Sequence, residues 1–261
     1  MFKMPEKIIY ALPEEIGNTE LFVGRKKEFD YYLGDWYYYL VNNMAQSQAI
    51  VARRKKGKTA FLQRLFNILW SCSESKVIPF YYAIQEEQIT RASFAKEFFA
   101  TFASHYLSFL TRNEEWVRTP FDYVEMKEYI TQYPDLYKKS KSIDAYEKTG
   151  NWDLMWKVAS RIPFDIAVST GVKVVQIIDE FQNINAYILD ERGNTIDTMS
   201  GAYLILAEKR EAPLIISGSE VHGLLEIVRR LTARFKERTL GNLPEDEAKE
   251  AIRRYAKASR T

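Results

Sequence analysis

The sequence ARRKKGKT, from Ala52 to Thr59, lies between a short apolar run and a segment with helical periodicity. It matches the pattern G-x-x-x-x-G-K-[ST] at every defined position except the first, where Ala52 replaces glycine. Residues 47–52 (SQAIVA) predict a buried strand. In residues 57–71 (GKTAFLQRLFNILWS), leucines and phenylalanines recur every three or four positions, which predicts a helix. A strand, this loop and a helix in that order predict a phosphate-binding loop.

Each part of the loop suits a polyphosphate ligand. A tight loop directs backbone N–H groups at phosphates, and the start of the helix adds the positive end of its dipole. Lys58 is expected to reach the β- and γ-phosphates, and the Thr59 hydroxyl to bind Mg²⁺. The residues expected to contact the nucleotide are Ala52, Arg53, Arg54, Lys55, Lys56, Gly57, Lys58, Thr59 and Ala60.

Two features of the loop leave alternatives open. Ala52 is small but disfavours positive φ, so we expect a slightly reshaped loop. The basic run RRKKGK would by its charge also suit a solvated loop, a nucleic-acid contact or a targeting signal. The strand before it and the helix after it favour phosphate binding.

A second motif ends a continuous apolar run, VVQIIDE, with Asp179 and Glu180. Ligands of open α/β sheets bind at the carboxyl ends of the strands, where such a pair would face the phosphates. Asp179 is expected to hold Mg²⁺, and Glu180 to orient or deprotonate the attacking water. Alone, the pair would equally suit a turn or a helix start.

The periodicity predicts alternating strands and helices. Further strands are expected at 76–84, 172–178, 213–217 and 238–240, with Pro79 placing its strand near an edge. Further helices are expected at 25–40, 91–110, 151–159, 202–209, 221–231 and from Pro244 onward, and a β-hairpin is expected around Gly193. We therefore predict an α/β fold, a three-layer αβα sandwich of the P-loop NTPase type with a mainly parallel five-stranded sheet.

Composition limits the alternatives. The chain has 261 residues, with 37 basic against 35 acidic side chains and a net charge of +2. This balance argues against a surface built throughout for nucleic acid. Cys72 is the single cysteine, which fits a reducing cytoplasm, and His105 and His222 offer little material for zinc. No run is long and apolar enough for a signal peptide or membrane span, so we expect a cytoplasmic protein without membrane partners.

Four segments resemble the archaeal-type ATPases of the AAA+/STAND branch of P-loop NTPases. Residues 21–25 (LFVGR), followed by Glu28, resemble the opening F-V-G-R-x-x-E segment of that family, and ARRKKGKT resembles its G-x-R-R-x-G-K-T loop. Residues 177–184 (IIDEFQNI) resemble its acidic strand end, and 214–225 (LIISGSEVHGLL) its fourth-strand segment. The resemblance implies ATP and Mg²⁺ as ligands, with Gly24 and Arg25 near the base.

The same resemblance implies further catalytic residues. Ser217, with Ser219 close behind, is the match for a polar residue that senses the γ-phosphate, although either serine would also suit a helix cap. Arg234, in the pair Ala233-Arg234, matches an arginine finger or sensor, which a homo-oligomer would supply in trans. Its rivals are Arg229, Arg230 and Arg238. Gln182 would relay the state of the γ-phosphate or, as we favour, bond locally.

The predicted domains are a P-loop ATPase domain at 1–244, with a helical insertion at about 112–150, and the start of a truncated helical lid at 245–261. Aromatic residues interleaved with lysines in the insertion would suit either single-stranded nucleic acid or, as we favour, a small helical core.

These features predict Mg²⁺-dependent ATP hydrolysis that drives or times a conformational change. The alternatives are a nucleotide-gated switch or scaffold with little turnover, and a nucleic-acid-associated module. No motif identifies the client, that is, the protein or nucleic acid on which the ATPase would act.

Overall fold

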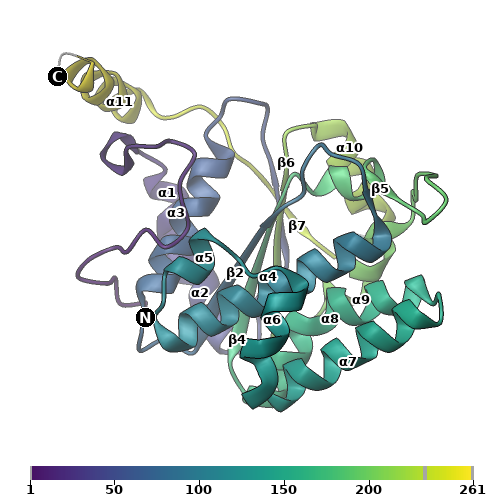
Figure 1. Cartoon of the computed structure of the whole chain (residues 1–261). Helices are drawn as coiled ribbons and strands as arrows, with labels where there is room; N and C mark the ends of the chain where they lie inside the picture. Colours follow the sequence, from purple (N-terminus) through teal and green to yellow (C-terminus); the bar gives the residue numbers. More distant parts are fainter. Residues whose placement is uncertain (1, 232–233, 260–261) are drawn as a thin grey trace.

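The computed structural model describes residues 2–231 and 234–259, and it has a parallel five-stranded sheet at its centre (Figure 1). The strands follow the order β2-β4-β6-β1-β7, and every neighbouring pair is parallel. Their bounds are β1 Gln48–Val51, β2 Val77–Ala83, β4 Lys173–Asp179, β6 Leu214–Gly218 and β7 Lys236–Thr239. The predicted α/β fold with a parallel five-stranded sheet is confirmed.

Burial explains why the three inner strands are mostly apolar. β1, β4 and β6 are covered on both faces, so their side chains are buried in both directions of the pleat. β2 is an edge strand, as Pro79 predicts, because a proline cannot donate to a further strand. β7 is the other edge, and its four residues, KERT, are mostly exposed.

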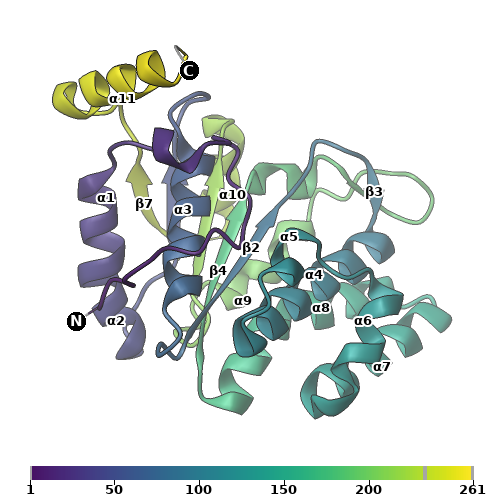
Figure 2. The same ribbon diagram turned by 60° about the vertical axis from the view of Figure 1, so that its left-hand side comes forward.

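Helices cover both faces of this sheet (Figures 1 and 2). On one face α3 (Lys58–Ser71) packs against α1 (Lys26–Asp30) and the turn after it, where the rings of Phe29 and Tyr32 lie 4.9 and 5.7 Å from that of Phe61. The other face carries α4 (Arg91–Thr111), α8 (Trp152–Thr170), α9 (Tyr203–Leu206) and α10 (Val221–Arg230). This layering follows from right-handed crossovers between parallel strands.

The helix expected at 25–40 is interrupted where its glycine lies. It comprises α1, a π-helical turn at Tyr31–Asp35 that contains Gly34, and α2 (Trp36–Val41). The wide turn keeps Tyr32 and Trp36 buried against the sheet layer.

Two elements differ from the expectation. α8 continues to Thr170, well past residue 159, with Pro163 inside it, and Gly171 ends it at φ +70°. The hairpin around Gly193 is reduced to a single bridge between Leu189 and Thr195. β5 (Ile188–Leu189) also pairs in parallel with β3 (Ile89–Thr90) in a separate small sheet, so the expected hairpin is present only in this minimal form.

Residues 112–150 form α5 (Glu115–Arg118), α6 (Tyr123–Tyr129), a 3-10 turn and α7 (Pro134–Lys148), beside α4 and α8. Their aromatic side chains pack on one another: the ring of Phe121 stacks on Tyr129 at 4.4 Å, and Trp116 contacts both. Tyr123 is buried and donates a hydrogen bond to the Ser140 carbonyl. Most aromatic side chains of this segment therefore serve packing, while Tyr137 is exposed.

The chain ends in α11 (Glu245–Ala258), which buries none of its side chains fully and lies beside the N-terminal segment (Figures 1 and 2). None of the helices among the described residues is long and apolar enough to span a membrane.

Candidate active site

The loop between β1 and α3 lies at the carboxyl edge of the sheet, as the sequence predicts. Lys55 and Gly57 have φ of +64° and +71°, the left-handed backbone that makes successive N–H groups converge on an anion. α3 begins at Lys58 without a side-chain cap, so its first N–H groups have no side-chain partner. Ala52 is buried and does not have positive φ, which is why alanine fits there in place of glycine.

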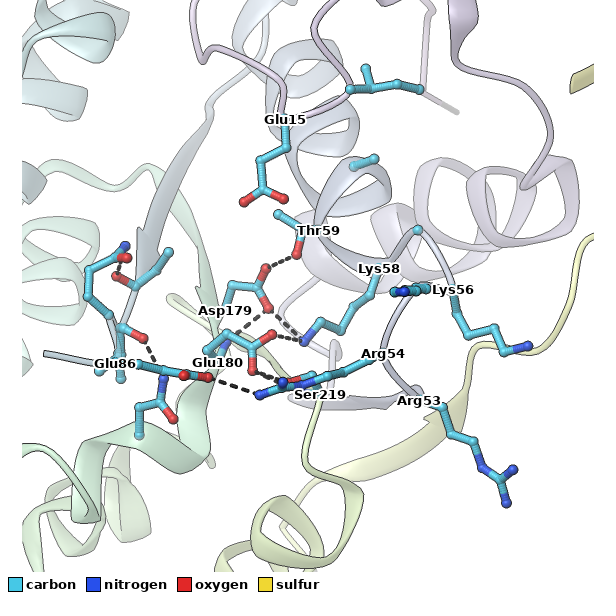
Figure 3. A pocket seen from close by; sticks show the side chains of 18 of the residues that line it. Glu15, Arg53, Arg54, Lys56, Lys58, Thr59, Glu86, Asp179, Glu180 and Ser219 are labelled. Atoms are coloured by element: carbon cyan, nitrogen blue, oxygen red, sulfur yellow. Dashed lines mark hydrogen bonds and ion pairs between the residues drawn. The ribbon is translucent and has the colours of Figure 1, made fainter. Parts of the chain in front are cut away.

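A pocket of about 730 Å³ opens beside this loop (Figure 3). Its lining comes from the loop, from the ends of β2, β4 and β6, from the N-terminal segment and from α11. The lining residues are 53–60, 83–86, Glu15, Ile16, Asp179, Glu180, Asn183, Ser219 and Tyr255. The predicted loop residues from 53 to 60 are therefore all at the pocket, and Ala52 lies behind them.

Four predicted side chains converge in the pocket. The Lys58 ammonium lies 2.6 Å from Glu180 Oε1 and 3.1 Å from Asp179 Oδ1. The Thr59 hydroxyl donates to Asp179 Oδ2 at 2.7 Å. Thr59 and Asp179 are 120 residues apart in the chain, and the two pairs meet because β1 and β4 both end at this edge of the sheet.

Asp179 also accepts hydrogen bonds from two buried hydroxyl groups that do not line the pocket. Ser217 donates a short hydrogen bond to Asp179 Oδ1, and the Tyr81 hydroxyl lies 3.4 Å from Oδ2. Ser217 is fully buried. Ser217 therefore does not line the pocket, contrary to the expected direct contact with the γ-phosphate, because its hydroxyl is committed to Asp179 beneath the pocket surface.

Ser219, the second candidate, does line the pocket. Its backbone N–H and its hydroxyl donate to Glu180 Oε2 at 3.0 and 2.8 Å, and Gln182 Nε2 donates to the same oxygen at 2.6 Å. Gln182 thus bonds locally, as favoured from the sequence. Burial would raise the pKa of Glu180, but hydrogen bonds from Lys58 and Gln182 outweigh it and lower the pKa to about 2. Glu180 is accordingly ionised at neutral pH.

The backbone at Glu180 has φ +51°, an uncommon value for a residue with a side chain. Strain of this kind persists where the surrounding structure fixes it, and it concentrates at functional sites. Here the four hydrogen bonds to the carboxylate and the start of the 3-10 helix Phe181–Asn185 hold the residue in place.

Arg25 connects the opening segment to the phosphate loop. Its guanidinium donates a short hydrogen bond to the Lys56 carbonyl and one of 3.0 Å to the Gly241 carbonyl. The same side chain lines an adjoining pocket of about 400 Å³ with Leu21, Phe22 and Tyr255. Gly24 does not line either pocket; a Cβ there would lie 2.4 Å from the Glu247 carboxylate, so glycine permits the close approach of α11.

Arg234 lies away from the pocket, which corrects its expected role as a sensor in its own site. It precedes β7 and therefore lies at the amino edge of the parallel sheet, opposite the loop. Its side chain binds the Leu204 carbonyl at 2.5 Å and Glu208 at 2.6 Å. Ala233, its predicted companion, lies outside the described residues.

Of its rivals, Arg230 pairs with Glu226, and Arg238 bonds Gln48 and stacks on Tyr31 at 3.2 Å. Neither these two nor Arg229 is among the residues that line the pocket.

Sequence reasoning missed Glu15 and Tyr255. Glu15 points toward Thr59 and Asp179 from the N-terminal segment (Figure 3). Burial, together with the negative charges of Asp179 and Glu180, raises the pKa of Glu15. Neither Glu15 nor Tyr255 belongs to a motif, so no local signal marks them.

The oxygen atoms of Thr59 and Asp179 fit a magnesium ion. Mg²⁺ prefers oxygen ligands and is commonly held by one or two protein groups, with phosphates and water completing its shell. Within residues 2–231 and 234–259, no group of three or more acidic, histidine or cysteine side chains is arranged to hold a metal ion. A protein cage for the metal is therefore not part of the described structure.

No protein-family model and no curated protein matches the chain. Among solved structures, it is similar to the Walker-type ATPase PABY2304 of Pyrococcus abyssi, with 14% identity, a TM-score of 0.50, and coverage of 94% of this chain and 61% of that chain. Two further matches have lower TM-scores. Cdc6p from Pyrobaculum aerophilum is 10% identical, with a TM-score of 0.47 and coverage of 98% and 55%. The ORC2 protein of Aeropyrum pernix is 12% identical, with a TM-score of 0.40 and coverage of 98% and 57%.

The chain spans less than two thirds of the length of each of these proteins. At 14% identity, the first likeness bears on the fold alone. The chain therefore shares the α/β fold of this Walker-type ATPase, which is a P-loop NTPase fold.

Proposed function

We propose that this chain binds ATP with Mg²⁺ and hydrolyses it. The observation that carries the proposal is the convergence of Lys58, Thr59, Asp179 and Glu180 at the mouth of the phosphate loop. One cation, one hydroxyl and two carboxylates in this arrangement can bind polyphosphate, hold a magnesium ion and orient a water molecule.

The two adjoining pockets would bind different parts of the nucleotide. The backbone of residues 53–60 and the Lys58 ammonium would bind the phosphates, and Thr59 and Asp179 would hold the metal, which supplies charge neutralisation when bound. The 400 Å³ pocket, lined largely by apolar side chains such as Leu21 and Phe22 together with Tyr255, would take the base.

Hydrolysis would use Glu180 as the group that orients the attacking water. The carboxylate is ionised, and Lys58 occupies Oε1. Phosphate oxygens that reach Lys58 compete with Glu180 for the same ammonium. ATP binding would in this way release Oε1 for a water molecule, while Ser219 and Gln182 keep Oε2 in position.

Replacing Lys58 with alanine tests the proposal. We expect the wild-type protein to bind ATP with Mg²⁺ in titration calorimetry, and Lys58→Ala to weaken binding at least about tenfold, because the loop loses its charge-assisted contact to the phosphates. Lys127→Ala is the matched control, since Lys127 pairs with Asp144 in the distant helical segment. Absence of wild-type binding, or equal binding by Lys58→Ala, would overturn the proposal.

A second candidate function is a nucleotide-gated switch with little turnover. The observation that favours it is that all four hydrogen bonds to Glu180 are already made within the protein. Glu180→Gln separates the two functions. A fall in turnover of about 100-fold or more with ATP binding retained supports the enzyme, because a positioned base typically contributes that much. A wild-type protein that binds ATP but has no measurable turnover supports the switch.

A further inference from the structure

The N-terminal segment before residue 20 is fastened along α3, the helix that begins at the phosphate loop. Gln63, Asn67 and Ser71 are four residues apart and therefore share one face of this helix. Gln63 Oε1 accepts from the Glu15 N–H at 2.8 Å, and Ser71 Oγ accepts from the Ile9 N–H at 2.8 Å. The segment thus runs antiparallel to α3 with a fixed register.

Two buried contacts in the middle fix this register firmly. Asn67 bonds both backbone groups of Leu12, accepting from its N–H at 2.8 Å and donating to its carbonyl at 2.9 Å. Arg64 forms a bidentate ion pair with Glu14 at 2.7 and 2.8 Å. The Glu14 side chain is fully buried, so the loss of this pair would leave an isolated charge.

The consequence is that Glu15, the next residue, is placed in the phosphate pocket. Its backbone is held by Gln63, and its carboxylate points toward Thr59 and Asp179 (Figure 3). Four carboxylates line this pocket, and one of them, Glu86, pairs with Arg54. Glu15 is thus an additional carboxylate near Asp179, which already shares the buried Lys58 ammonium with Glu180. Basic side chains of the loop also line the pocket, but Glu15 adds its negative charge on the side of Thr59 and Asp179, where it would repel a metal-free triphosphate and attract a divalent cation.

We propose that Glu15 is a positioning residue that makes nucleotide binding in this pocket depend on the divalent cation. This inference rests on the proposed function of the site. The carboxylate disfavours the metal-free nucleotide and favours the metal-bound form, by attraction to the cation or to the water molecules around it. Because the segment is clamped to α3, Glu15 remains at the pocket without belonging to the loop or to a strand end.

The test is a comparison of binding constants with and without metal. The dissociation constant of ATP is measured by calorimetry in excess Mg²⁺ and in EDTA. The constant in EDTA divided by the constant in Mg²⁺ gives the metal dependence. We expect Glu15→Gln to lower this ratio at least about fivefold, the lower end of the usual range for coupling between two ligands. Most of the change should be tighter binding in EDTA. Glu15→Asp, which keeps the charge, should retain most of the wild-type ratio.

Glu20→Gln is the control, because Glu20 is an exposed acid directly after this segment and does not line the pocket. An unchanged ratio in Glu15→Gln overturns the inference while leaving the proposed function intact. Equal weakening with and without metal also overturns it, since that result indicates a merely structural role. Failure of the wild-type protein to bind ATP under either condition overturns the proposed function, and this inference with it.

Discussion

Replacing Glu180 with glutamine removes one charge from the group that Lys58 contacts at 2.6 Å, and its effect on stability follows from the site. The pKa of Glu180 is lowered from 4.5 to about 2 against the opposing effect of burial. A shift of this size corresponds to about 3 kcal/mol of folding stability at neutral pH. Glutamine keeps acceptor capacity toward Ser219, so we expect Glu180→Gln to lower the free energy of unfolding by about 1 to 3 kcal/mol at pH 7.

The lowered pKa of Glu180 also determines how this stability difference changes with pH. The pKa is depressed in the folded state, so the stabilisation is fully present above pH 4.5 and is lost as the pH falls from there toward 2. The difference between wild type and Glu180→Gln should therefore be constant from pH 7 to about pH 5 and should shrink below it. Urea unfolding of both proteins at several pH values, without nucleotide, measures this difference.

Glu226→Gln is the matched control, because Glu226 pairs with Arg230 on the exposed surface of α10. An exposed pair at this spacing contributes about 0.3 to 0.5 kcal/mol. The reasoning is refuted if Glu180→Gln is as stable as wild type at pH 7, or more stable. That result would mean that the cost of burying the Glu180 charge exceeds the gain from Lys58 and Gln182.

Two further substitutions test the corrected roles of predicted residues. Ser217→Ala should lower the free energy of unfolding by about 1.5 to 3 kcal/mol in urea melts, because it removes a buried hydrogen bond to the Asp179 carboxylate; a fall in turnover without loss of stability would restore the sensor role. Arg234→Ala should leave turnover within about twofold of wild type at every protein concentration, because its partners, Leu204 and Glu208, lie outside the pocket. A loss that grows with protein concentration would instead support an arginine finger in trans.

The pocket residues that the sequence predicted correctly lie at strand ends or helix starts, which a local sequence pattern can identify. Lys58 and Thr59 start a helix directly after a strand, and Asp179 and Glu180 end another strand. In a parallel sheet, both positions lie at the carboxyl edge, so local pattern and sheet geometry together place four side chains in one site.

Where the prediction failed, the outcome depended on contacts between distant segments. Ser217 and Ser219 are two residues apart, and only the path of the chain after Gly218 decides which one reaches the pocket. A Cβ at Gly218 would lie 2.2 Å from Gln182 Oε1, so this path is set by packing against the residues after β4. Glu15 is placed by its bond to Gln63, 48 residues away, which no periodicity reveals.

Both candidate functions would begin with the same step, in which a phosphate changes the contact between Lys58 and Glu180. Its ammonium is bound to Asp179 and Glu180, so a phosphate that approaches it must share or displace these carboxylates. Since Glu180 also contacts Ser219 after β6 and Gln182 after β4, a change in the Lys58 contact reaches two strand ends at once. A hydrolase would use the released oxygen to orient water, and a switch would use the movement of the strand ends. Under the proposed function, the nucleotide would act first on the Lys58–Glu180 pair in either case, and the rate of turnover after that step would distinguish the two.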